Sequence, residues 1–462
     1  VLALPKLKGL NITKTDGASN QAARHPNILL IGSDGVNARN MSLYGYQRDT
    51  TPNLSKLANE SLVAENAFTN SGNTSGSIIS IFNSKLPTQT RLIYPPDILR
   101  GSDAYQHLPG ILRSLGYTNK EISAAHYIDA YTLNVRDGFD EVNERSVDQA
   151  GFQIFTRLPG FQDSGYFLSV LFERISDRLL HIFFIRPMVN PYQEVTTNVF
   201  STNDQNKVRK LLDDFRYGAQ PMFVHVHLMG THGAFFNIDR QVYSAGQTQE
   251  EPWMTDFYDD SILAFDEFMG VIWSELTKMD MLDNTIIIVY SDHAQDYHTE
   301  QSVPLLIRFP HGEYARRVRS NVENLDIAPT ILDYLGIPIP DWMAGQSLLD
   351  ADPDPLRPIF STGVSGTEAV AEDGFWVTDE TRIQPPFYQF AYLRAVVCQE
   401  WYLLDLRDYY FNQGEVLGHS APCPQETLPD KETIVAGMMD RLALDGFDIS
   451  PLQERYSPPT SD

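Results

Sequence analysis

The sequence predicts an α/β fold in which a mostly parallel central sheet is flanked by helices and followed by a smaller carboxyl-terminal α+β subdomain. Three segments support this prediction, residues 28–31, 222–228 and 285–290, because each is a run of mostly aliphatic or β-branched side chains. Such runs are typical of strands buried on both faces of a parallel sheet. The chain has 462 residues, which exceeds one minimal core and favours a large domain with a smaller partner.

The other elements follow from caps, turns and hydrophobic spacing. Thr51 and Pro52 are typical of the N-cap and first position of a helix, and Gly336 is typical of a helix end. In chain order we expect strand 26–34, helix 51–58, strand 63–68, a helix from about 75 to 84, helix 108–115, strands after Gly116 and at 139–142, strand 222–228, helix 258–276, strand 284–290, strand 303–307 and helix 324–335.

Composition divides the chain into three parts. Residues 1–24 are polar and lack a clear period, and we interpret them as a linker or surface arm. Residues 25–350 contain the predicted central sheet. Residues 351–462 begin with a proline-rich linker at 353–358. The aromatic, strand-like segments after it predict a smaller antiparallel sheet, and residues 431–444 predict a helix that packs with it.

Residues 166–184 form the most apolar helical pattern of the chain. Arginines and an aspartate interrupt a wide apolar face, which predicts an amphipathic helix. We interpret this face as packing on the protein's own core. The alternative is docking on a membrane surface or on a membrane domain outside this chain.

The bulk properties exclude some classes of partner. The formal net charge of −25 argues against nucleic-acid binding, which needs a basic face. No stretch has the roughly 18 uncharged apolar residues of a transmembrane helix, and the amino-terminal segment does not resemble a signal peptide, so we expect a mature or trimmed form. Cys398 and Cys423 are the only cysteines, and their spacing fits either one disulfide or two reduced thiols.

The polar loop at residues 73–77, Asn-Thr-Ser-Gly-Ser, is the first candidate site. A helix that begins near Ser75 would point its free N–H groups at a bound anion, and Gly76 would let that anion approach the backbone. A hydroxyl here becomes a nucleophile only if something lowers its pKa, as a divalent metal does. The alternative is an ordinary Ser/Thr helix cap.

Metal-ligating side chains follow two of the predicted buried strands. Asp34 ends the first strand, and the adjacent Asp292 and His293 follow the strand at 284–290. Open α/β sheets place their ligand sites at the carboxyl ends of strands. Oxygen and nitrogen donors together suit Zn²⁺ or Mn²⁺, although Asp34 alone would also fit a cap or turn.

Three histidines mark the strand at 222–228 and the loop after it. Strand alternation places His225 and His227 on the same side, where core histidines are also common. His232 lies beyond the strand in a glycine-flanked loop and is the better candidate for a site.

Separated motifs in a common order resemble the sulfatase family of the alkaline phosphatase superfamily. The first is Pro26–Asp34 with Thr51-Pro52-Asn53-Leu54 downstream, and the second is Asn284–His293. The likeness spans roughly residues 25–410 and implies an alkaline-phosphatase-like sheet. Its remaining motifs are Val303-Pro304-Leu305-Leu306, Asp326–Leu332 and Trp401–Leu406.

Two departures from the usual sulfatase pattern shape the expected chemistry. Sulfatases carry a Cys or Ser, converted to formylglycine, in a Cys-x-Pro-Ser-Arg motif. Thr74, Gly76 and Ile78 stand at the Cys, Pro and Arg positions here, and Asp34-Gly35 replaces the usual Asp-Asp pair. Both departures resemble the phosphotransferase relatives, the lipoteichoic acid synthases and lipid A phosphoethanolamine transferases, which use a threonine nucleophile.

This resemblance assigns roles to individual residues. It implies that Asp34, Thr74, Asp292 and His293 bind a first metal, with Thr74 as the nucleophile. The segment His227–Ala234 is similar to the His-x-x-Gly-Ser/Thr-His-Gly-Pro segment of these transferases, which implies that His232 contacts the substrate phosphate. We expect His298 to take part in catalysis. We further expect substrate contacts from His227, Asn73, Ser75 and Lys85.

The resemblance implies a metal-dependent phosphotransferase or phosphodiesterase, with a sulfatase that lacks the standard motif as the alternative. The cofactor is expected to be a divalent metal, Zn²⁺ or Mn²⁺ before Mg²⁺ or Ca²⁺. The substrate is expected to be a phosphate or sulfate ester, with a lipid-linked ester as one candidate. Relatives of this kind imply a periplasmic or cell-surface location, tethered by an amino-terminal membrane domain outside this chain.

Overall fold

The structure is a computed structural model, and it describes most of the chain outside the first 24 residues. The linker expected at residues 1–24 lies outside the described part. The described residues are 25–146, 203–350, 352–364, 383–420 and 428–456, with the short pieces 164, 167–168, 171–172, 175, 178–179, 182–183, 367–369 and 376–378.

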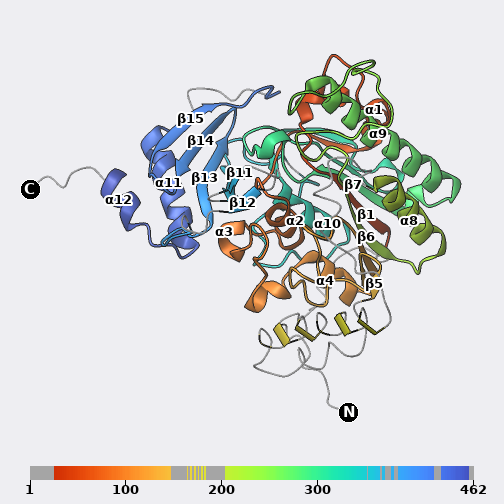
Figure 1. Cartoon of the computed structure of the whole chain (residues 1–462), viewed down its shortest axis with the longest axis horizontal. Helices are drawn as coiled ribbons and strands as arrows, with labels where there is room; N and C mark the ends of the chain where they lie inside the picture. Colours follow the sequence, from red (N-terminus) through yellow and green to blue (C-terminus); the bar gives the residue numbers. More distant parts are fainter. Residues whose placement is uncertain are drawn as a thin grey trace, which may run out of the picture.

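A nine-stranded sheet forms the centre of the molecule, and its middle strands carry the site (Figure 1). Strand β1 (Asn27–Ser33) lies between β6 (Met222–Leu228) and β7 (Thr285–Ser291), and all three run parallel. Every residue of these strands is buried. The three runs of aliphatic residues are therefore the three central strands, as the sequence predicts.

The remaining strands extend the sheet on both sides. Strand β8 pairs antiparallel with β7 and β2, and β5 pairs antiparallel with β4, so the sheet is mostly but not wholly parallel. The order is β5-β4-β3-β6-β1-β7-β8-β2-β9, with β2 Leu62–Phe68, β3 Thr118–Ile122, β4 Glu141–Val142, β5 Arg145–Ser146, β8 Leu305–Arg308 and β9 Arg316–Glu323.

Helices cover both faces of the sheet and give it two separate cores. Ile28 and Leu30 of β1 face one core, and Leu29 and Ile31 face the other, because side chains alternate along a strand. The first core contains α2 (Thr74–Asn83), α4 (Leu108–Ser114) and α10 (Ile327–Tyr334). The second contains α1 (Pro52–Leu57), α8 (Asp204–Tyr217) and α9 (Thr255–Lys278).

Short helices connect these elements. Two of them matter below, η4 (Gly101–Ala104) and η6 (Gln295–Tyr297). The others are α3 Pro87–Thr90, η1 Ala38–Asn40, η2 Ser42–Tyr44, η3 Ala58–Glu60, η5 Leu282–Asn284, η7 Pro310–Gly312 and η8 Asn324–Asp326.

A four-stranded antiparallel sheet follows the main domain and packs beside the loop at residues 71–73. The backbone N–H of Gly72 donates to the carbonyl of Thr362, and the N–H of Val364 donates to Asn73 Oδ1. The second sheet therefore supports the loop that carries Thr74. Its elements are β10 Ile359–Val364, β13 Phe390–Val397, β14 Glu400–Asp405 and β15 Phe411–Glu415, with the pair β11 Thr367–Ala369 and β12 Trp376–Thr378 and the helices α11 Lys431–Leu444 and α12 Ser450–Tyr456.

Cys398, at the turn between β13 and β14, is disulfide-bonded. The only other cysteine of the chain, Cys423, lies outside the described residues. Of the two alternatives that the spacing allowed, the structure has the disulfide.

The prediction for residues 166–184 is half right. The described residues of this segment are helical, but their large apolar side chains are exposed instead of packed on the protein's own core. The packing interpretation is therefore wrong. No helix in the described residues is long and apolar enough to cross a membrane.

Candidate active site

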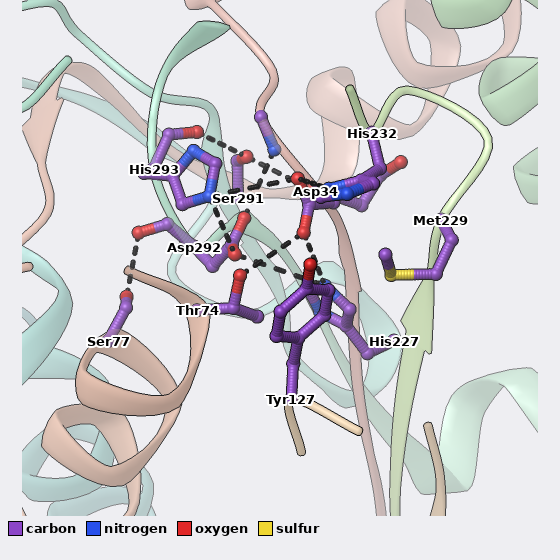
Figure 2. A network of polar contacts seen from close by, with 12 residues as sticks. Asp34, Thr74, Ser77, Tyr127, His227, Met229, His232, Ser291, Asp292 and His293 are labelled. Carbon is purple, nitrogen blue, oxygen red and sulfur yellow. Dashed lines mark hydrogen bonds and ion pairs between the residues drawn. The ribbon is translucent and has the colours of Figure 1, made fainter. Parts of the chain in front are cut away.

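Two parallel strands deliver three metal-ligating side chains to one edge of the sheet. Asp34 follows β1 directly, and Asp292 and His293 follow β7, so parallel pairing in register brings them together. One ligand atom from each of the three lies within 4.8 Å of the others (Figure 2). All three side chains are buried, and Asp292 Oδ1 accepts a hydrogen bond of 3.1 Å from the Gly35 N–H.

Thr74 completes this cluster from the other side. It is the first residue of α2, and its hydroxyl donates to Asp34 Oδ2 at 3.2 Å. The helix start is anchored, because the hydroxyls of Ser77 and Thr69 donate to the Asp292 carbonyl at 2.7 and 2.5 Å. The four residues predicted as metal ligands therefore meet in space.

Gly72 and Gly76 are required by close packing around this loop. A Cβ on Gly72 would lie 2.7 Å from the Tyr297 carbonyl oxygen, and one on Gly76 would lie 2.6 Å from Ser71 Oγ. Both distances are shorter than real Cβ contacts, so a side chain would displace the loop and Thr74 with it.

His232 approaches the cluster from the loop after β6. The Asp204 carboxylate accepts hydrogen bonds from the Met229 and Gly230 N–H groups, which holds the start of this loop. His232 Nδ1 then lies 3.0 Å from Asp34 Oδ1. The His232 side chain is 17% exposed, so the ring contacts the Asp34 carboxylate and also reaches solvent at the edge of the site.

The imidazoles determine the charge of the Asp34 carboxyl. Burial acts to raise the pKa of Asp34, but the nearby His232 and His293 outweigh burial and hold that pKa well below its usual value. Asp34 is therefore a carboxylate at neutral pH, as a metal ligand must be.

His227 does not lie where a substrate contact would be expected. Its side chain is fully buried, and its Nε2 lies 3.6 Å from Asp34 Oδ2 and 4.0 Å from Asp292 Oδ2. The ring therefore faces the two carboxylates from within the protein, which favours a role beside these ligands over direct contact with a substrate.

The residues present fit a divalent cation. Among the described side chains, Asp292 Oδ2, His293 Nε2 and both ring nitrogens of His227 are buried without a hydrogen-bond partner. Unpaired buried polar atoms are costly, and a bound cation would satisfy those that face the cluster. The mixed oxygen and nitrogen donors suit Zn²⁺ or Mn²⁺.

Two tyrosines that the sequence analysis did not single out border the cluster. The Tyr127 ring lies 5.5 Å from the His232 ring, and the Tyr297 ring lies 5.0 Å from the His293 ring (Figure 2 shows Tyr127). Burial raises the pKa of each phenol, and the nearby Asp34 carboxylate adds to the increase. Tyr297 could have been found from its closeness to His293 in sequence. Tyr127 carries no such signal, because it comes from the loop after β3.

Three expected substrate contacts are used elsewhere in the structure. Asn73 Oδ1 accepts from the Val364 N–H, and the fully buried Ser75 hydroxyl donates to the Tyr127 carbonyl at 2.5 Å. Lys85 lies beyond the far end of α2, where its Nζ pairs with Asp103 at 2.6 Å. The expectation for Lys85 is therefore wrong, because a buried ammonium group needs this local carboxylate.

His298 belongs to a polar group that joins the two sheets. It follows η6, and its Nδ1 lies 2.5 Å from Glu300 Oε1, while Glu300 Oε2 accepts from Arg394 of β13. Burial acts to raise the pKa of Glu300, but His298 and Arg394 lower it to about 2. The Glu300 hydrogen bond in turn raises the pKa of His298.

We expect Glu300→Gln to shift the pH profile of activity if His298 gives a proton to the leaving group. A raised pKa keeps His298 protonated to higher pH, so removing the carboxylate should move the alkaline limb of kcat to lower pH. The comparison is kcat against pH for wild type, Glu300→Gln and His298→Gln. An unmoved limb in Glu300→Gln, or an intact limb in His298→Gln, would remove His298 from the proton path.

Comparisons with known proteins agree with this geometry. The family model described as Sulfatase matches residues 26–337, which is more than half of the chain. The chain is 22% identical over 424 residues to an N-acetylglucosamine-6-O-sulfatase of Bacteroides thetaiotaomicron, covering 75% of this chain and 74% of that protein. It is 34% identical to human Arylsulfatase K over 105 residues, which is only 20% of either protein.

A solved structure shows the same fold. The phosphonate monoester hydrolase of Agrobacterium radiobacter superposes with a TM-score of 0.57 at 17% identity, covering 91% of this chain and 95% of that one. With two thirds of its length matched by one family model, and with its acidic and imidazole side chains gathered at the strand ends, the chain belongs to the sulfatase family, a group of hydrolases within the alkaline phosphatase superfamily.

Proposed function

We propose that the protein is a metal-dependent hydrolase that cleaves a sulfate or phosphate ester through Thr74. One observation carries the proposal: the Thr74 hydroxyl lies 3.2 Å from Asp34 Oδ2, inside the cluster that Asp34, Asp292 and His293 form. A buried hydroxyl at a helix start commonly serves as a helix cap. The Thr74 hydroxyl instead lies beside Asp292 and His293, whose buried Oδ2 and Nε2 atoms have no hydrogen-bond partner.

A divalent cation held by these residues would favour the Thr74 alkoxide and neutralise negative charge on the ester oxygens. Thr74 Oγ1, whose proton passes to solvent water, then forms a bond to sulfur or phosphorus as the ester bond to the alcohol breaks in line. His232, partly exposed beside Asp34, is placed to donate a hydrogen bond to an ester oxygen. His298 supplies the proton of the departing alcohol, and water releases the group from Thr74.

The class of ester has two candidates, and different observations support them. The names of the relatives favour a sulfate ester, and an N-acetylglucosamine-6-O-sulfatase is among them, so a sulfated saccharide is the first candidate. The threonine at the nucleophile position and the phosphonate monoester hydrolase neighbour favour a phosphorus ester. A transfer to an acceptor alcohol, in place of water, belongs to this second candidate.

A paired assay separates the two candidates. Aryl sulfate and aryl phosphate or phosphonate esters with the same leaving group are compared by kcat/KM, with Zn²⁺ and Mn²⁺ supplied in turn. A matched leaving group ensures that the difference reports the group attacked by Thr74. The exact mass of the covalent adduct on Thr74 distinguishes a sulfo from a phospho group. Turnover of neither ester class in any metal would contradict the proposed function.

We further propose an extracytoplasmic location, at a cell surface or in a periplasm. The disulfide at Cys398 supports it, because such bonds persist in oxidising compartments and are rare in the cytosol. The net charge of −25 does not predict a basic surface for nucleic acid, so the composition does not oppose this location.

A further inference from the structure

Backbone contacts hold Tyr127 beside the proposed nucleophile. Its carbonyl accepts a hydrogen bond of 2.5 Å from the hydroxyl of Ser75, which directly follows Thr74 at the start of α2. Its N–H donates to the Ala124 carbonyl at 3.1 Å, and its neighbour Ile128 is fully buried in the first core. The loop after β3 is therefore fixed to the helix that carries Thr74, which gives the Tyr127 phenol a defined position.

The side chain of Tyr127 points from this loop toward the ligand cluster. Figure 2 shows its ring directed at Asp34 and Thr74. The ring lies 5.5 Å from the His232 ring, and the Asp34 carboxylate is close enough to act on the pKa of the phenol. The phenol therefore stands next to His232, the residue that is placed to contact an ester oxygen.

The Tyr127 hydroxyl makes no hydrogen bond to any residue that the structure describes. Tyrosine hydroxyls that are withdrawn from water usually find a partner, so the missing partner here is informative. Burial raises the pKa of this phenol, and the neighbouring Tyr94, Tyr297 and Asp34 add to the increase. The hydroxyl therefore keeps its proton at neutral pH and remains a hydrogen-bond donor.

A second unpaired phenol in the same chain provides a contrast. The Tyr117 hydroxyl is also buried without a hydrogen-bond partner. Tyr117 stands just before β3, however, whereas Tyr127 comes after it, and β3 runs parallel to β6. Tyr117 therefore lies at the opposite edge of the sheet from the site, and burial alone raises the pKa of its phenol. Only the Tyr127 donor stands among carboxylate and imidazole groups that could hold an anionic ester.

We propose that Tyr127 is a catalytic residue whose phenol donates a hydrogen bond to a non-bridging oxygen of the ester at Thr74. This inference rests on the function proposed above. A donor that is fixed before the reaction stabilises charge on these oxygens in the transition state more than in the bound substrate. Sulfate and phosphate esters both carry such oxygens, so the role of Tyr127 is the same for either class.

Tyr127→Phe tests the inference because it removes the hydroxyl and keeps the ring. We expect kcat on the best ester to fall on the order of 10²-fold, with an unchanged melting temperature. Orthovanadate imitates the five-coordinate transition state, and calorimetry on the metal-loaded protein should show on the order of tenfold weaker binding. Tyr117→Phe removes an equally unpaired hydroxyl away from the site and should match wild type in both measurements.

The two measurements separate this inference from the proposed function. Wild-type kcat in Tyr127→Phe would overturn the role of Tyr127 and leave that of Thr74 standing. A lower kcat with unchanged vanadate affinity would also overturn it, because the phenol would then not contact the anion. If the wild type turns over no ester, the proposed function fails, and calorimetry still decides. Weaker vanadate binding in Tyr127→Phe would then support the contact, and equal or absent binding would overturn it.

Discussion

Replacing Thr74 with alanine is expected to reduce kcat on the best ester substrate by on the order of 10³-fold or more. The hydroxyl stands at the start of α2 beside the ligand cluster and donates to Asp34 Oδ2 at 3.2 Å. Removing it deletes the atom that would form the covalent bond, so no adduct should appear at this position by mass spectrometry. KM should change much less than kcat, because ester binding uses other groups.

Two further variants make the Thr74 result interpretable. Thr74→Ser keeps a hydroxyl and should retain part of the activity and the adduct. Thr88→Ala removes another buried hydroxyl, which donates to Asp445 at 2.6 Å outside the ligand cluster, and should leave kcat near wild type. Wild-type turnover in Thr74→Ala would refute the nucleophile assignment.

Replacing Asp292 with asparagine is expected to weaken metal binding by on the order of 100-fold or more, because it removes a charged ligand from a buried site. Asparagine keeps an oxygen that can accept the 3.1 Å hydrogen bond from the Gly35 N–H, so the loop should keep its shape. The measurements are metal content after gel filtration and competition titration with a chelator, both independent of turnover.

Asp296 provides the matched control for this experiment. It is an exposed carboxylate four residues away, and its φ of 56° is a backbone conformation that asparagine also adopts well. Asp296→Asn should therefore retain wild-type metal content. If Asp292→Asn binds metal as tightly as wild type, the ligand cluster is misassigned.

The central strands were predictable because the sheet is buried on both of its faces. Strands β1, β6 and β7 contain nearly continuous aliphatic or β-branched runs because helices cover both sides of the sheet. The edge strand β9 was not predicted, because Arg316, Arg317 and Arg319 interrupt its apolar pattern. Helix α8 was also missed, since charged residues outnumber its few buried apolar positions.

The candidate site was predictable to the extent that it follows strand ends. Asp34, Asp292 and His293 stand directly after buried strands, so their meeting follows from parallel pairing. Lys85 was misplaced because its partner Asp103 comes from a separate short helix, η4, and no pattern in the sequence links the two. The contact between Arg394 and Glu300 was not predicted either, because Arg394 comes from the second sheet and no pattern in the sequence links the two residues.

Local sequence alone was enough to identify the central strands, several helix starts and the order of the candidate metal-ligating residues, because these depend on hydrophobic period and on caps within a few residues. Tertiary contacts between distant segments decided the rest. They placed His227 behind the carboxylates, drew Lys85 away to Asp103 and left one face of the helix at 164–183 exposed. An amphipathic period in the sequence predicts that a helix has an apolar face. Whether the protein itself covers that face depends on how its other elements pack.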